Sequence, residues 1–330
     1  MVERIGTFLW TMEFHLLYAS LVWLAAWLLT SSRGGSATAK YWIWVATSIN
    51  FLLPFSAIPL PVRISTASGK TWTTPGLMIA ATTWAIGTAV MIARLIVRVR
   101  IERSDDAATS FLADGVPVRF SASRRVPAVE GILRPRICLP VELERVLTRD
   151  ELDAVLLHEL RHAKRRDNLI RLLHEVSVCL FWFHPLVWMT GARLALYREL
   201  SCDESVMRRA DGRDLVSALA KLAAPDDALL LQASASSFLA DRLASLTAAA
   251  PPRHGAANAI LATSFAVVLL GGALGPVMHP VCAGVKGGVA GGVKGGVKGG
   301  VAGGIAGGVT GGIKGGVRGG VQGGVAGGIR

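Results

Sequence analysis

The residues best suited to chemistry in this sequence form the pentapeptide His158-Glu159-Leu160-Arg161-His162. Side chains four positions apart lie on one face of a helix, so both imidazoles can reach a single metal ion. Glu159 then lies beside the open coordination position, where a general base must be. The pattern therefore predicts zinc-assisted hydrolysis at this point of the chain.

A catalytic zinc usually takes three protein ligands, so a further ligand is expected elsewhere. The best candidates are Glu199 and Asp203, which are four residues apart and project from one helical face. One carboxylate could bind the metal, and the other could orient a ligand histidine by accepting its remaining ring proton. Glu204 offers similar chemistry one step round the helix. The four cysteines form no C-x-x-C pair, so a thiolate zinc site is not expected.

The elements around the pentapeptide follow from the local pattern. Thr148 and Glu151 form a capping box, which starts a helix that carries the metal ligands, and a long helical region follows to about Val178. Upstream, short apolar runs between Phe111 and Pro140 are broken by glycines and prolines and predict a few short strands. Residues 178–189 are very apolar but too short to span a membrane, which leaves a buried helix, a re-entrant hairpin or an interfacial segment open.

The composition indicates a membrane protein, because 52% of the 330 residues are hydrophobic and the mean hydropathy is +0.46. Four apolar stretches have the length of a spanning helix, namely 7–30, 41–62, 76–97 and 256–278. Arginines gather just after the third stretch, which places residues 98–255 in the cytoplasm. The net charge of +12 lies in such flanks and in the C-terminal tail, so no direct nucleic-acid binding is expected.

From Val285 to its end the chain repeats a four-residue unit, [V/I]-x-G-G. One apolar residue in four cannot bury a core against the entropy of so many glycines, so we expect a disordered, low-complexity tail. The expected fold is a mainly α membrane protein with a cytoplasmic α+β zinc-metalloprotease domain. Its expected parts are a three-helix transmembrane region at 1–97, the protease domain at 98–255, a fourth transmembrane helix at 256–279 and the tail at 280–330.

The chain resembles the M56 peptidases, the zinc-protease part of the BlaR1/MecR1 antibiotic sensor-transducers. Four motifs in order carry the resemblance: VEGILRPRICLP, HELRHAKRRDN, FWFHPLVW and RELSCDE. The resemblance covers roughly residues 1–280. It implies a gluzincin-like fold with Zn²⁺ bound by His158, His162 and Glu199, Glu159 as the catalytic base, and Asp203 orienting a ligand histidine. It also implies a bacterial cytoplasmic membrane protein with its tail outside, acting on a protein substrate such as a cytoplasmic repressor.

The sequence departs from these sensor-transducers after its last apolar stretch. They carry a penicillin-binding domain with an S-x-x-K motif, whereas a glycine repeat follows residue 280 here, so covalent β-lactam sensing is not expected. The leading hypothesis is a membrane-anchored zinc endopeptidase that relays a signal by cutting a transcriptional repressor. The alternatives are a protease resembling the M48 quality-control peptidases and a catalytically silent receptor or scaffold. The oxyanion stabiliser stays open among Tyr197, Arg198 and His184.

Overall fold

The computed structural model describes residues 2–31, 34–53, 74–101, 110–122, 124–222, 236–247 and 255–273. Two compact units share the chain. The first consists of Met1–Thr11, Pro59–Thr73 and Gly275–Arg330, of which the described residues include only the first turns of one helix. The second, Met12–Ile58 with Thr74–Leu274, holds every described strand and the rest of the described helices. The tail expected at 280–330 lies outside the described residues.

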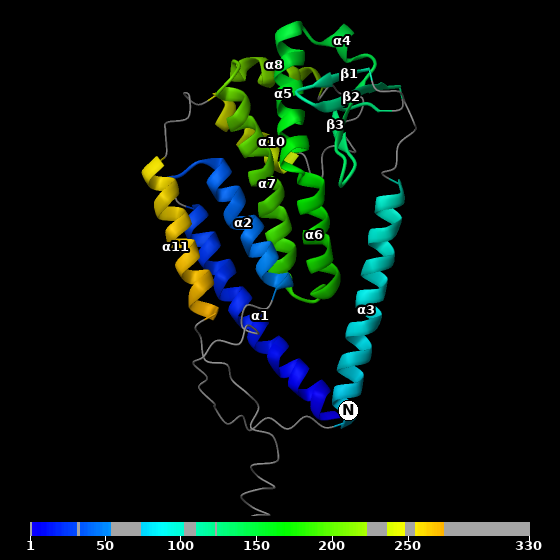
Figure 1. Ribbon diagram of the computed structural model, residues 1–330, viewed down its shortest axis with the longest axis vertical. Helices are drawn as coiled ribbons and strands as arrows, with labels where there is room; N and C mark the ends of the chain where they lie inside the picture. Colours follow the sequence, from blue (N-terminus) through cyan, green and yellow to red (C-terminus); the bar gives the residue numbers. More distant parts are fainter. Residues whose placement is uncertain are drawn as a thin grey trace, which may run out of the picture. The chain divides into compact units, whose positions relative to one another are not determined.

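Helices dominate the described part of the chain, around one small sheet (Figure 1). The helices before the sheet are α1 (Val2–Ser31), α2 (Ala37–Leu52) and α3 (Thr74–Ile101). The strands are β1 (Phe111–Ala113), β2 (Val116–Ser121), β3 (Ala128–Glu130) and β4 (Arg136–Pro140). The helices after the sheet are α4 (Leu143–Val146), α5 (Arg149–Arg165), α6 (Asp167–Leu180), α7 (Pro185–Met207), α8 (Gly212–Leu222), α10 (Ser236–Thr247) and α11 (Gly255–Ala273).

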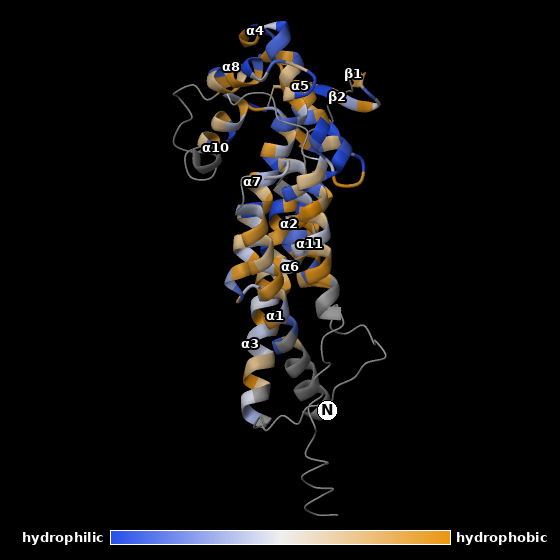
Figure 2. Cartoon of the chain, turned by 90° about the vertical axis from the view of Figure 1, so that its left-hand side faces the viewer, coloured by the Kyte–Doolittle hydropathy of each residue, from blue (hydrophilic) through white to orange (hydrophobic). Residues whose placement is uncertain are grey.

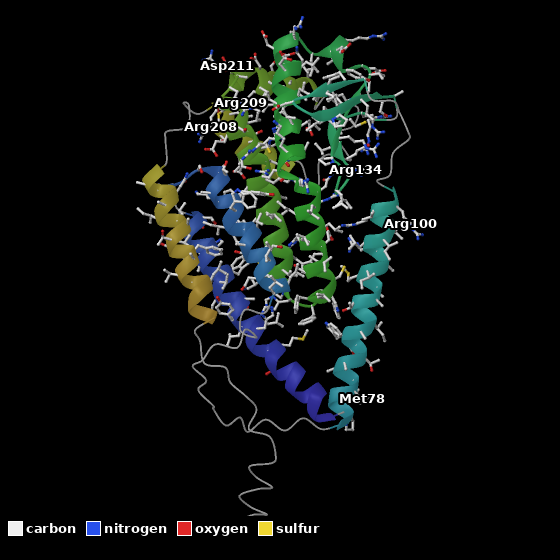
Figure 3. All side chains as sticks on the ribbon, viewed as in Figure 1. Met78, Arg100, Arg134, Arg208, Arg209 and Asp211 are labelled. Atoms are coloured by element: carbon white, nitrogen blue, oxygen red, sulfur yellow. The ribbon has the colours of Figure 1, made fainter. Side chains whose placement is uncertain are left out.

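One helix in the described part of the chain is long and apolar enough to cross a membrane, by length and composition alone. It is Met78–Arg100 in α3, and almost all of it is unburied; Figure 3 labels both end residues. The apolar stretches in α1 and α11 are shorter. Helix α2 has 16 residues, or about 24 Å, which is less than the hydrocarbon thickness of a bilayer. The other three expected spans therefore stay predictions, and 54–62 and 274–278 lie outside the described residues.

The strands expected between Phe111 and Pro140 are confirmed and form a four-stranded sheet in the order β1-β2-β4-β3. Strands β1 and β2 pair antiparallel, β2 and β4 parallel, and β3 and β4 antiparallel. Strand β3 is consequently an edge strand. Apolar residues of the sheet pack on α5 and α8 in a core that includes Val118, Ile137, Leu139, Val155 and Leu215.

A second core joins α1, α2, α7 and α11 through side chains such as Val22, Trp44, Leu194 and Phe265. Helix α2 packs along both α6 and α7. In Figure 2 hydrophilic colour gathers on the strands and the α4–α5 end, and hydrophobic colour on α2 and α6. Helix α5, which carries the pentapeptide His158–His162, therefore connects a polar region around the sheet with an apolar helical region.

The capping box at the start of α5 is confirmed, since Glu151 N donates to Thr148 Oγ1 and Thr148 N donates to Glu151 Oε2. The long helical region expected as far as Val178 is confirmed, and one residue divides it into two helices. Arg166 adopts the left-handed conformation, with φ 57° and ψ 46°, and separates α5 from α6. A non-glycine residue in this conformation costs about 1–2 kcal/mol, so neighbouring contacts must hold the break in place.

Residues 178–189 do not form the single buried helix that was one of the three alternatives, and whether they enter the membrane stays a prediction. They comprise the end of α6, a turn at 181–184 and the start of α7, where Pro185 occupies the first helical turn. The apolar segment is thus the tip of a helical hairpin. This hairpin brings the second half of α7, with its acidic residues, back toward α5.

Candidate metal centre

Helices α5 and α7 bring together the three predicted metal ligands, His158, His162 and Glu199. The two Nε2 atoms lie 3.0 Å apart, and Glu199 Oε2 lies 3.5 Å from that of His158 and 3.8 Å from that of His162. Zinc bonds of about 2.0–2.1 Å in tetrahedral geometry place ligand atoms about 3.3–3.4 Å from one another. The spacing and the chemistry of this donor set therefore fit a zinc ion.

The other ring nitrogen of His158 faces Asp203, which lies one helical turn after Glu199 on α7. The Nδ1 atom is 3.0 Å from Asp203 Oδ1, and the Asp203 side chain is fully buried. Arg242 of α10 donates two hydrogen bonds of 2.8 Å to the same carboxylate. Its Nη1 also lies 3.6 Å from Glu199 Oε2. Asp203 thus occupies the position expected of a group that orients a ligand histidine.

A second carboxylate, which sequence reasoning missed, serves His162 in the same way. Asp167 Oδ2 lies 2.6 Å from His162 Nδ1. Arg165 donates to both oxygens of Asp167 at 2.6 and 2.7 Å, and the Tyr41 hydroxyl donates to Oδ1 at 2.9 Å. The break at Arg166 makes this possible, because residues five apart on a continuous helix point about 140° away from each other. One general rule could have predicted this contact, because a metal-binding histidine usually has a carboxylate partner at its other ring nitrogen.

Electrostatics favour the charged form of these acids. Burial opposes ionisation of Asp167, but its contacts with His162 and Arg165 outweigh burial and lower its pKa to about 2. Burial likewise opposes ionisation of Glu199, yet His162, Arg198 and His158 hold its pKa well below its usual value. Burial disfavours the charged His158 imidazole, but Asp203 and Glu199 raise its pKa to about 9. A metal ion that binds here at neutral pH must therefore displace a proton from His158.

The predicted base, Glu159, lines a cleft of about 240 Å³ together with His162 and Glu199. Arg198 lines it too, and its Nε donates to Glu199 Oε1 at 3.0 Å. Val129 of the edge strand β3 forms another part of the wall. The catalytic candidate and two of the predicted metal ligands thus face one open space.

Two of the three residues considered for the oxyanion have contacts elsewhere. The Tyr197 hydroxyl donates to the carbonyl of Thr30 in α1, and His184 Nε2 lies 3.3 Å from the Ser20 hydroxyl. Arg198 is the one of the three that lines the cleft with Glu159.

Two further residues near the metal centre are engaged differently from the ligands. Glu204 Oε2 accepts hydrogen bonds of 3.0 Å from both the main-chain nitrogen and the hydroxyl of Thr38, so it faces α2. Cys202 Sγ lies 3.5 Å from His162 Nδ1, and burial raises the pKa of its thiol. The cysteine is therefore protonated and lies on the side of His162 away from Nε2.

Comparison with known proteins identifies the family of the chain. The family model described as BlaR1 peptidase M56 matches residues 62–245, more than half of the chain. The regulatory protein BlaR1 of Bacillus licheniformis is 39% identical over 85 residues, which are 26% of this chain and 14% of that protein. The methicillin resistance mecR1 protein of Staphylococcus aureus is 26% identical over 98 residues, 30% of this chain and 17% of that protein. The chain therefore covers less than a fifth of these relatives, and it belongs to the M56 family of BlaR1-type peptidases.

Proposed function

We propose that the chain is a membrane-anchored, zinc-dependent endopeptidase. The observation that carries the proposal is the triangle of ligand atoms from His158, His162 and Glu199, two of which, His162 and Glu199, line the same cleft as Glu159. A zinc ion bound there supplies a Lewis acid that polarises the scissile carbonyl and lowers the pKa of water. Asp203 and Asp167 hold the two imidazoles with Nε2 directed toward the metal.

In this mechanism Glu159 accepts a proton from the attacking water and delivers it to the leaving amine. Arg198 lies in the wall of the cleft, and we assign it to stabilise the charge that develops on the carbonyl oxygen. The edge strand β3 offers main-chain groups with which an extended peptide can pair. Asn168 supports that strand, since its amide donates to Val129 O at 2.8 Å and to Gly131 O at 3.2 Å.

The proposal includes four membrane-spanning helices, at 7–30, 41–62, 76–97 and 256–278. It places the peptidase domain at 98–255 on the cytoplasmic side of the membrane, with the apolar segment 178–189 reaching into the bilayer, and the tail outside. The apolar surface of α3 and the arginines of its last turns support this arrangement. The proposed substrate is a cytoplasmic transcriptional repressor, because the relatives include a protein named for regulation and one named for methicillin resistance.

The test compares Glu159→Gln with Glu144→Gln, which alters an exposed glutamate of α4. Both full-length variants are purified in detergent, their zinc content is measured, and each is incubated with a candidate repressor. We expect one zinc per chain in both and cleavage only in Glu144→Gln. Cleavage by Glu159→Gln would contradict the mechanism. Equal cleavage of unrelated unfolded proteins would favour a quality-control protease, and absence of zinc from the wild type would favour a scaffold.

A further inference from the structure

A larger cavity, of about 580 Å³, adjoins the metal centre between α3, α6 and α7. Its volume lies within the range of small-molecule sites. Helix α3 presents one face to it, since Met91, Arg94 and Arg98 follow helical spacing. On α7 the lining includes Gly191, Ala192 and Ala195, whose small side chains leave the space open.

The helices run in opposite directions along this cavity. Near the start of α3, Trp84 Nε1 donates to the carbonyl of Leu180, at the end of α6. Farther along α3, Arg98 lies 3.7 Å from Glu175, closer to the start of α6. Because α3 and α6 are antiparallel, the last turns of α3 and the first turns of α6 meet at the same end of the cavity.

That end is rich in arginine, whereas the opposite end is apolar. Arg94 and Arg98 come from the last turns of α3, Arg171 from the first turns of α6 and Arg198 from the second half of α7. Toward the α6–α7 turn the lining consists of apolar side chains, among them Met91, Val178 and Trp188. The cavity therefore has the polarity of an amphiphile, with a cationic end and an apolar end.

Four guanidinium groups line the cavity against two carboxylates, Asp167 and Glu175. Asp167 already binds Arg165 and His162, and Glu175 is near Arg98. His174 also lines the cavity, and burial lowers its pKa to about 4, so it adds no charge at neutral pH. Arg198 in turn donates to Glu199 of the metal centre. With that carboxylate counted, the arginines still outnumber the acids, which favours an anion, and the planar guanidinium fork suits a phosphate.

The arginine end also has the right depth for a lipid headgroup. Arg94 and Arg98 belong to the last two turns of the candidate span Met78–Arg100, whose surface is almost entirely unburied. Residues at the cytoplasmic end of a spanning helix lie at the level of the headgroups, and basic pockets between helices at this level bind anionic lipids.

We propose that this cavity binds an anionic phospholipid of the inner leaflet, with its phosphate against Arg94 and Arg98 and an acyl chain along Met91, Val178 and Trp188. The proposal rests on α3 crossing the membrane, which is part of the proposed function, and does not depend on peptidase activity. Three residues of the lipid site, Asp167, Arg171 and Arg198, also line the metal cleft.

The experiment measures binding of phosphatidylglycerol and phosphatidylcholine to the full-length chain in neutral detergent by native mass spectrometry. The double variant R94Q/R98Q removes the proposed phosphate ligands. Its control, R100Q/R134Q, removes the same charge from two exposed arginines outside the cavity (Figure 3). A third variant, Ala192→Trp, fills the cavity and keeps its charges.

We expect the wild type to prefer phosphatidylglycerol. R94Q/R98Q should weaken its binding by about thirty-fold, or about five-fold per arginine. The control should match the wild type, and Ala192→Trp should lose the lipid. Equal binding of both lipids, or equal losses in R94Q/R98Q and its control, would overturn the proposal.

Two competitors separate the lipid from other anions. Inorganic phosphate that binds as tightly as phosphatidylglycerol would identify a site for the free anion and overturn the proposal. An acidic peptide that binds the wild type and is lost in R94Q/R98Q, while phosphatidylglycerol is not, would assign the cavity to substrate instead. Because neither readout involves cleavage, a negative result leaves the proposed peptidase function standing.

Discussion

Replacing Asp167 by asparagine tests how the metal centre is held. The carboxylate accepts hydrogen bonds from His162, Tyr41 and Arg165, the last through two nitrogens. Asparagine has nearly the same shape, but it carries no charge and turns one acceptor into a donor. Loss of the carboxylate partner of a ligand histidine typically lowers metal affinity by about 10–100-fold, or about 1.4–2.7 kcal/mol. We expect the zinc affinity of Asp167→Asn to fall within this range.

The same substitution has a separate effect on stability through Arg165, whose side chain is 3% exposed. Breaking a buried ion pair costs about 3–5 kcal/mol, because the remaining charge loses its partner. Arg165 also donates to the Ser201 hydroxyl and the Arg198 carbonyl, so we expect the lower end of that range. Thermal unfolding of the metal-free chain should therefore begin at a lower temperature.

Competition with a chromogenic chelator at fixed pH measures the zinc affinity. Asp153→Asn, on an exposed position of α5, is the matched control and should bind zinc like the wild type. Tyr41→Phe removes one hydrogen bond to Asp167 and leaves its charge, so its zinc affinity should fall less than ten-fold. A folded Asp167→Asn chain with wild-type affinity, or an equal loss in Asp153→Asn, would refute the reasoning.

Three further predictions concern the same helices. Glu199→Gln should lower zinc affinity by at least about 100-fold, because it removes a predicted ligand. Glu204→Gln should keep an affinity within about two-fold of the wild type, because the Glu204 side chain faces α2. Zinc content after gel filtration checks both. Zinc affinity should rise with pH up to about 9, because the metal displaces a proton from His158. In the metal-free chain, protonated His158 stabilises the fold fully below pH 6.5, and this stabilisation is lost as pH rises to about 9. The free energy of unfolding, measured in urea with a chelator, should therefore fall over that range. A Cβ at Gly87 would overlap the Trp182 ring, so Gly87→Val should separate α3 from the α6–α7 turn and lower the melting temperature in detergent.

The parts of the metal centre that could be predicted from the sequence depend on short spacings. His158 and His162 are four residues apart on α5, and Glu199 and Asp203 are four apart on α7. One helical turn fixes which side chains share a face, regardless of the rest of the fold. The capping box of Thr148 is local for the same reason. Such patterns require only the helix itself.

The rest of the centre depends on contacts between distant segments. Arg242 follows its partner Asp203 by 39 residues, and Tyr41 precedes Asp167 by 126. The break at Arg166 has no glycine or proline to mark it, so helix periodicity continued across it. Nothing local predicts a left-handed arginine, because its cost is offset by contacts such as those of Asp167 with His162 and Arg165.

The contacts of α2 explain why an apolar run contains polar residues at Thr38, Tyr41 and Ser48. The first two donate to Glu204 and Asp167, and the Ser48 hydroxyl lies 3.0 Å from His174 Nδ1. A buried polar group left without a partner costs about 1–3 kcal/mol, so these side chains require α6 and α7 as neighbours. Any displacement of α2 must therefore either break these bonds or move Asp167 with it. Because Asp167 holds His162, the position of α2 and the geometry of the metal centre are physically linked.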